Sequence, residues 1–198
     1  EMYPNTKMIQ GNILDKEIFN KITNIALENK CDFLIATPPC QGMSIAGKQD
    51  KNDSRNILIT KVVEAIKIIK PKYFLIENVL AIPKTNIFVN NKLISIETYL
   101  KEELLNEYNF SINFIDTKDF EIPQSRKRTI VLGTLKSFNE WKIPNKVYRK
   151  ITVRDAIGDL PSLESGETSN VEYHYAKKHN ENHILWLKNT PTGKTALD

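Results

Sequence analysis

Two consecutive prolines limit what the early part of this chain can form. The apolar run Phe33–Ala36 is followed, after one threonine, by Pro38 and Pro39 and then by Cys40. Proline cannot donate to a sheet ladder, so a central strand has to end there. We therefore expect Cys40 just beyond the carboxyl end of a strand, where open α/β sheets bind their ligands. This position favours a reactive thiol, whereas Cys31 precedes the strand and is interpreted as a core cysteine.

The first two-thirds of the chain alternate short β-like runs with helical patterns, which predicts a parallel sheet with crossover helices. Strands are expected at 7–10, 33–36, 73–76, 111–115 and 129–133. Helices are expected at 16–29 and 55–70, an apolar helical face at 95–108, and a loop at 86–92. After Lys136, prolines, glycines and serines become frequent. We expect residues 1–136 to form one domain and residues 137–198 to form a linker and the start of a second, irregular domain.

Composition restricts the class of protein without identifying it. No stretch has the eighteen or so apolar residues of a membrane span, and the first residues do not resemble a signal peptide. Two cysteines among 198 residues form no disulfide framework, which favours a reducing, intracellular setting. The net charge of +4 is compatible with nucleic acid as a partner but does not establish it.

A glycine-rich loop for a nucleotide cofactor is absent, since the sequence contains no G-x-G. Either the chain binds no such cofactor, or the loop lies upstream of Glu1.

Four polar constellations are predicted at or near the carboxyl ends of strands. They are P-P-C-Q-G-x-S at 38–44, D-x-R at 53–55, E-N-V at 77–79 and D-F-x-I-P-Q-x-R-x-R at 119–128. Together they would bring a thiolate nucleophile, Cys40, to a carboxyl group, Glu77. Arg126 and Arg128 alternate, so within a strand they would face the same side and could hold an anionic or carbonyl-bearing substrate.

Cysteine hydrolases usually activate their thiol with a histidine. Here the histidines are His174, His179 and His183, all in the irregular part, which argues mildly against that class. No cysteine accompanies them, and we expect no metal site.

In order and spacing, these blocks resemble the C5-cytosine DNA methyltransferase family. The resemblance extends through T-V-R-D-A-I-G-D-L-P at 152–161, which is similar to the segment that links the catalytic and target-recognition domains. It implies a Rossmann-like, S-adenosylmethionine-dependent methyltransferase sheet. Residues 1–136 would be part of the catalytic domain, and residues 137–198 would lead into the target-recognition domain.

The resemblance also implies a mechanism. Cys40 would add as a thiolate to C6 of a cytosine that has been flipped out of double-stranded DNA. Glu77 would act at the N3 edge, and Arg126 and Arg128 would hold the cytosine O2. C5 would then accept a methyl group from S-adenosylmethionine. The residues implied in DNA or loop contacts are Gln41, Ser44, Arg55, Asn78 and Gln124, with Asn78 orienting the Cys40 loop.

The cofactor site departs from the family pattern. The F-x-G-x-G loop and the acidic ribose ligand are absent, and Asn12 stands where the family has an aspartate facing the adenine amine. The cofactor contacts carried over are Asn12, Ile13, Pro38 and Leu58. We therefore expect a sheet without its first strands. The rest would come from missing N- and C-terminal parts of the same protein or from a complementary subunit.

Two other functions share these blocks. One is a tRNA cytosine methyltransferase, although residues 171–198 resemble the entry to a DNA-recognition domain and favour DNA. The other is a catalytically silent DNA-binding fragment. The leading hypothesis is a bacterial or phage restriction–modification methyltransferase, acting in the bacterial cytoplasm, without a metal or a membrane as partner.

Overall fold

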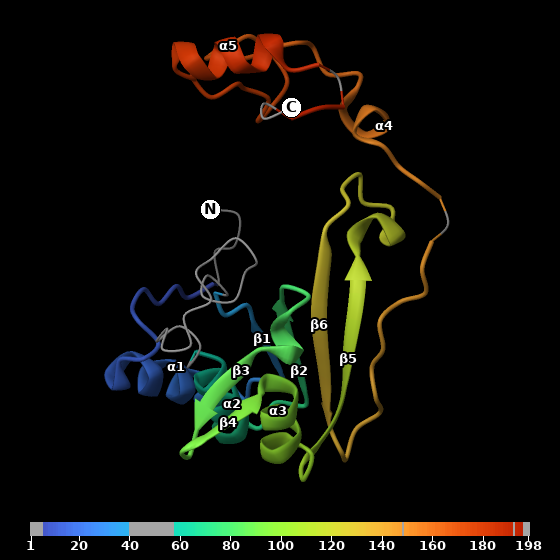
Figure 1. Cartoon of the computed structure of the whole chain (residues 1–198). Helices are drawn as coiled ribbons and strands as arrows, with labels where there is room; N and C mark the ends of the chain where they lie inside the picture. Colours follow the sequence, from blue (N-terminus) through green and yellow to red (C-terminus); the bar gives the residue numbers. More distant parts are fainter. Residues whose placement is uncertain (1–5, 40–57, 148, 192, 196–198) are drawn as a thin grey trace. The chain divides into compact units, whose positions relative to one another are not determined.

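The computed structural model describes residues 6–39, 58–147, 149–191 and 193–195, and the chain divides into two compact units (Figure 1). The first unit is Glu1–Lys150 and the second is Ile151–Asp198. The domain boundary expected after residue 136 remains a prediction.

The first unit contains a four-stranded mixed sheet with the strand order β1-β2-β6-β5. The strands are β1 (Phe33–Ala36), β2 (Tyr73–Asn78), β5 (Tyr108–Asp116) and β6 (Lys127–Leu135). The predicted α/β class is confirmed, but the expectation of a parallel sheet holds only for β1 and β2. β6 runs antiparallel to both of its neighbours. The short connection 117–126 permits this because antiparallel strands need no crossover helix.

Helices bury one face of this sheet. The predicted helix at 55–70 is described from Leu58 onward as α2 (Leu58–Ile69), and its apolar stripe packs with α3 (Ile96–Leu104) against Phe74 and Ile76 of β2. The helix α1 (Lys16–Glu28) lies beside α2, where Phe19 packs with Ala65. Burying a Val, Leu, Ile or Phe side chain contributes about 1.5–3 kcal/mol, so this interface stabilises the unit.

Aromatic side chains from the segment after β6 pack against part of the opposite face of the sheet. Trp141 packs edge-on against Phe33, with ring centroids 5.1 Å apart, and lies 5.7 Å from Tyr73. Its indole N–H donates to the carbonyl of Gly133 over 3.2 Å. The first residues of the expected linker, 137–141, therefore belong to the first unit and pack against its sheet.

The prediction of a loop at 86–92 is wrong, because this region forms a β-hairpin. Its strands are β3 (Asn86–Val89) and β4 (Lys92–Ser95), paired antiparallel. Asn90 and Asn91 make the turn with φ of 49° and 61°. A two-residue turn of this kind needs positive φ at both positions, which asparagine tolerates well.

The strand expected at 7–10 is also wrong. These residues are irregular and pair with no strand in the described ranges. A short β-prone run without a pairing partner has no ladder to stabilise it. The helix predicted at 16–29 is confirmed as α1. It begins after Asp15, which is the N-cap and accepts a hydrogen bond from the Glu17 amide.

The second unit has little regular structure, as predicted for this part of the chain. It contains α4 (Val153–Ile157), which begins with a capping box between Thr152 and Asp155, and α5 (Glu181–Asn189). In the described parts of both units, no helix is long and apolar enough to cross a membrane.

Candidate active site

An ion pair on neighbouring strands forms the centre of the candidate site. Glu77 in β2 lies opposite Ile130 in β6, and Arg128 is two residues before Ile130 on the same face. Arg128 Nε and Glu77 Oε1 form an ion pair over 2.7 Å. The two side chains are 30% and 21% exposed, so the pair is half-buried and still accessible from solvent. The same guanidinium donates a hydrogen bond from Nη1 to the carbonyl of Lys127 over 2.8 Å.

These contacts determine which parts of the two side chains remain available. Arg128 donates a hydrogen bond from Nη1, and its Nε faces Glu77, whereas Nη2 donates to no residue in the described part of the chain. Glu77 Oε2 has no hydrogen-bond partner among the described residues either. The pair therefore offers a carboxylate acceptor and a planar donor side by side, which suits a flat heterocycle with alternating donors and acceptors.

Asn78 lies on the other face of β2 and joins two strand ends. It is only 4% exposed. Its Nδ2 donates to the carbonyl of Pro38 over 2.9 Å, and its Oδ1 accepts from the Val79 amide over 2.9 Å. Pro38 follows β1 and comes two residues before Cys40. This amide ties the start of the P-P-C segment to the end of β2. The sequence placed Glu77 and Asn78 after the strand, but they are its last two residues.

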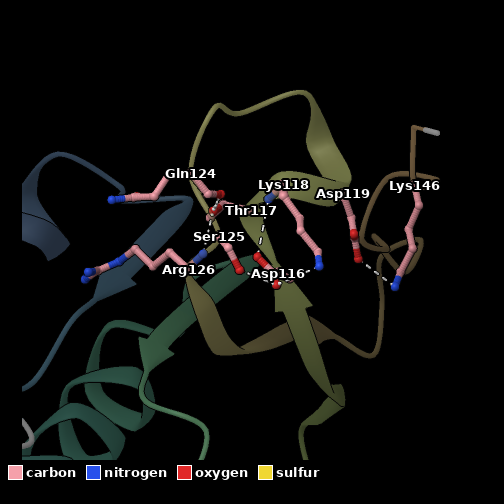
Figure 2. Close-up of polar contacts among 8 residues, drawn as sticks. All are labelled: Asp116, Thr117, Lys118, Asp119, Gln124, Ser125, Arg126 and Lys146. Carbon is pink, nitrogen blue, oxygen red and sulfur yellow. Dashed lines mark hydrogen bonds and ion pairs between the residues drawn. The ribbon is translucent and has the colours of Figure 1, made fainter. Parts of the chain in front are cut away.

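The P-Q-x-R-x-R block forms the end of the connection from β5 to β6 and the first two residues of β6 (Figure 2). Arg128 lies inside β6, whereas Arg126 precedes the strand. The Arg126 amide donates to Thr117 Oγ1 over 3.1 Å, and Thr117 Oγ1 donates to the carbonyl of Gln124 over 2.6 Å. The two arginines therefore differ in setting: Arg128 is bound to Glu77, and Arg126 extends from a turn.

Asp116 and Thr117, which the sequence reading did not single out, organise this turn. Asp116 is 8% exposed, and its Oδ2 accepts from Ser125 Oγ over 2.9 Å. Burial opposes ionisation of Asp116. Hydrogen bonds from Ser125 and from the Lys118 and Arg126 amides, together with the Lys118 ammonium, outweigh burial and lower the pKa of the carboxyl. An Asp-Thr pair at the end of a strand, just before a turn, is the sequence signal that could have indicated them.

The residues carried over as cofactor contacts lie on three different elements. Asn12 and Ile13 precede α1, Pro38 follows β1, and Leu58 begins α2. Asn12 Oδ1 accepts from the Leu14 amide over 3.0 Å, and a carbonyl oxygen has a second lone pair to offer. Ile13 packs against the cluster of Phe19, Ala65 and Ile69, to which Leu34 of β1 also contributes. An exposed amide acceptor next to apolar surface is chemically suited to an adenine ring, which has an amino donor and apolar faces.

Other predicted site residues lie outside the described residues. They are Cys40, Gln41, Ser44 and Arg55. Their placement as nucleophile or as DNA and loop contacts remains a prediction.

The histidines make contacts within the second unit. His174 Nδ1 lies 2.8 Å from Ser169 Oγ, and the His183 ring is 5.2 Å from that of Trp186. These contacts lend no support to a cysteine hydrolase. Within the described ranges, no three His, Cys, Asp or Glu side chains gather as metal ligands.

Solved structures share this fold. The chain superposes on a candidate DNA modification methyltransferase encoded within an E. coli prophage with a TM-score of 0.63, over 93% of this chain and 52% of that one, at 22% identity. For DNMT2 of Spodoptera frugiperda the TM-score is 0.51, over 75% of this chain and 43% of that one, at 17% identity. At these identities the likeness establishes the α/β methyltransferase fold alone.

The sequence comparisons establish the family. The chain belongs to the C-5 cytosine-specific DNA methylases, whose family model matches residues 2–198. It is 46% identical to the type II methyltransferase M1.HgaI of Avibacterium volantium, over 100% of this chain and 56% of that protein. It is 30% identical to M1.HphI of Haemophilus parahaemolyticus, over 89% of this chain and 47% of that protein. The chain thus spans about half the length of these relatives.

Proposed function

We propose that this chain carries the cytosine-binding and nucleophilic part of a DNA cytosine-C5 methyltransferase of the type II restriction–modification kind. The observation that carries the proposal is the pair of Glu77 and Arg128, 2.7 Å apart on neighbouring strands of a member of this family. The relatives named as type II methyltransferases support the choice of DNA as substrate.

The ion pair suits the Watson–Crick edge of cytosine. Glu77 would hold N3 and its proton, while Arg128 would donate to O2 as negative charge develops in the ring. Their ion pair holds both planar groups side by side before the base arrives, so that little reorganisation is needed during the reaction. Arg126 would add a second positive charge at this edge.

Cys40 would provide the nucleophile. Cytosine C5 is a weak nucleophile until the thiolate adds to C6, which forms a C–S bond and makes C5 electron-rich. S-adenosylmethionine, when bound by Asn12, Ile13, Pro38 and Leu58, would supply the methyl group that bonds to C5, with S-adenosylhomocysteine as the leaving group. A base then removes the C5 proton, and the electron pair of that C–H bond expels the Cys40 thiolate. The bond from Asn78 to Pro38 would keep the P-P-C segment at the end of β1.

This chemistry requires access to both faces of the ring. A cytosine stacked in a duplex does not offer it, so the base would be flipped out, with Gln41, Ser44, Arg55 and Gln124 contacting DNA or closing the loop. The partner would be double-stranded DNA, the remaining catalytic elements would come from further parts of the protein or from a complementary subunit, and the location would be the bacterial cytoplasm.

Methyl transfer by the complete gene product that carries this chain tests the proposal. With labelled S-adenosylmethionine, we expect methylation of unmethylated DNA at C5 of cytosine and none of tRNA. Cys40→Ser should lower the rate by more than about a thousandfold, as loss of a covalent nucleophile does. Cys31→Ser is the matched control, since Cys31 packs against the cluster of Phe19, Ala65 and Ile69, and it should remain active.

Three outcomes would contradict the proposal. Undiminished transfer by Cys40→Ser would exclude the covalent mechanism. Transfer to tRNA in place of DNA would support the tRNA methyltransferase. DNA binding without any transfer would support the catalytically silent fragment.

A further inference from the structure

The connection between β5 and β6 is tied closed at its base by Thr117. The Thr117 hydroxyl donates to the carbonyl of Gln124 over 2.6 Å and accepts from the amide of Arg126 over 3.1 Å. The Thr117 amide in turn donates to the carbonyl of Arg126 over 3.1 Å. One residue thus makes three hydrogen bonds to the two positions on either side of Ser125, which fixes the backbone of both.

Asp116 holds the residue between them. Its Oδ2 accepts from Ser125 Oγ over 2.9 Å and lies 3.7 Å from Lys118 Nζ. Asp116 is the buried end of this contact, so Ser125 is drawn toward the sheet. Residues 124, 125 and 126 are therefore each bound to Asp116 or Thr117. We call these two residues the brace.

The brace directs two long polar side chains outward. Figure 2 shows Gln124 and Arg126 extending from the turn in a common direction, while Ser125 faces Asp116. Neither long side chain donates or accepts a side-chain hydrogen bond with another residue of the described ranges. Long side chains such as these have many rotamers. Because the backbone of both residues is fixed, the positions that their side chains can reach are limited.

The tip of the same turn is strained. Glu121 has φ 59° and ψ 24°, a left-handed conformation that costs a non-glycine residue about 1–2 kcal/mol. Just after it, the Gln124 amide donates to the carbonyl of Ile122 across Pro123 over 2.7 Å. A strained backbone persists where surrounding contacts over-determine it, and the brace fixes the residues 124–126 that follow this tip.

We propose that Thr117 and Asp116 are positioning residues that act through Gln124 and Arg126 to present these two side chains to the DNA around the flipped cytosine. This inference rests on the proposed function. It gives Thr117 a role in the reaction although the residue touches neither substrate nor cofactor. Asp116 contributes by holding Ser125, and Thr117 contributes through its hydroxyl.

The test is a double-mutant cycle in the complete gene product, read as kcat and KM for DNA. Thr117→Val removes the hydroxyl and keeps the shape. It should lower kcat/KM about tenfold, equivalent to about 1.4 kcal/mol, which is the scale of one net hydrogen bond. In a Gln124→Ala/Arg126→Ala background the same change should cost less than about twofold, because coupled residues are not additive. Thr117→Ser, which retains the hydroxyl, should restore most of the activity.

Thr85→Val is the matched control. Thr85 is also partly buried, and its hydroxyl donates to a backbone carbonyl, that of Ala81, over 3.1 Å. Thr85→Val removes one hydrogen bond and Thr117→Val removes two, so Thr85→Val should lower the unfolding midpoint by a smaller amount while leaving kcat/KM unchanged.

The outcomes separate the two proposals. An active wild type whose kcat/KM is unaffected by Thr117→Val, or is lowered equally in both backgrounds, overturns the positioning role alone. A wild type that transfers no methyl group overturns the proposed function and this inference with it.

Discussion

At the scale of single residues, the candidate site depends on the carboxylate of Glu77. A second carboxylate, that of Glu103, has a similar exposure and a similar ion pair. Glu77 is paired with Arg128 over 2.7 Å and is 30% exposed. Glu103, on the helical side of the sheet, is paired with Lys67 over 2.7 Å and is 29% exposed. Similar exposure and pairing predict similar, small contributions to stability. If replacement of Glu77 lowers the rate and replacement of Glu103 does not, the difference is therefore due to a role of Glu77 in the reaction and not to lost stability.

We expect Glu77→Gln to lower kcat by at least about a hundredfold, the lower end for a group that handles a proton in the transition state. Glu103→Gln should leave kcat within about twofold, since a partly exposed pair contributes little. Steady-state methyl transfer and urea unfolding of both variants provide the measurement. Equal kcat values for the two variants would remove Glu77 from the mechanism.

Asp116 makes stability depend on pH in a defined direction. Its pKa is lower in the folded protein than in the unfolded chain. As the pH falls below about 5, the unfolded chain takes up the proton first, so the contribution of Asp116 is complete above that range and is lost as the pH drops through the folded pKa. Asp116→Asn should be less stable than the wild type at pH 7, and the difference should shrink below about pH 4. Urea unfolding at pH 7 and pH 3.5 measures it, and a difference that grows at low pH would reverse the sign.

At the scale of elements, structure that depends on residues close in sequence is easier to predict than structure that depends on which distant segments pair. The helix ending at Ile69 was predictable because its apolar spacing and the following proline are local signals. The hairpin around Asn90 and Asn91 was not predicted, although its turn signal is also local, because the apolar runs on both sides are short. The antiparallel direction of β6 depends on which strand it pairs with, and no local pattern specifies that.

The β5–β6 connection allows a prediction at this scale. Glu121→Gly should relieve the left-handed strain at the tip and raise the free energy of unfolding by about 0.5–1 kcal/mol, since the entropy that glycine adds to the unfolded chain offsets part of the gain. Urea unfolding measures the change. A loss of stability would show that the Glu121 side chain contributes more than its backbone conformation costs.

At the scale of the whole first unit, one position of β6 has no room for a side chain because a ring of β2 fills the space. Gly133 lies opposite Phe74, and a Cβ at Gly133 would be 2.0 Å from the Phe74 ring, which is fully buried. We expect Gly133→Ala to cost about 1–3 kcal/mol, as overpacking does. Adding Phe74→Leu should recover part of that loss because the two changes share one space. Thermal unfolding of the single and double variants tests this, and strict additivity would contradict it.

The candidate site was partly predictable for a related reason. Family motifs identified Glu77 and Arg128, and the fold brings them together. The Asp116–Thr117 brace was not predicted, because contacts across a turn depend on how that turn folds. In the second unit, the capping box of Thr152 is one of the few features that fix the local backbone.

Covalent trapping of Cys40 tests the central claim most directly. In DNA that contains 5-fluorocytosine, the fluorine replaces the C5 proton and cannot leave as a cation, so elimination stops after methylation and the C–S bond persists. The account predicts a stable adduct between DNA and the complete gene product in the presence of S-adenosylmethionine. Trypsin yields one peptide, 31–48, that contains both cysteines, so fragment ions must assign the bond to Cys40 and not to Cys31. An active enzyme that forms no adduct, or an adduct on any other residue, would contradict the account.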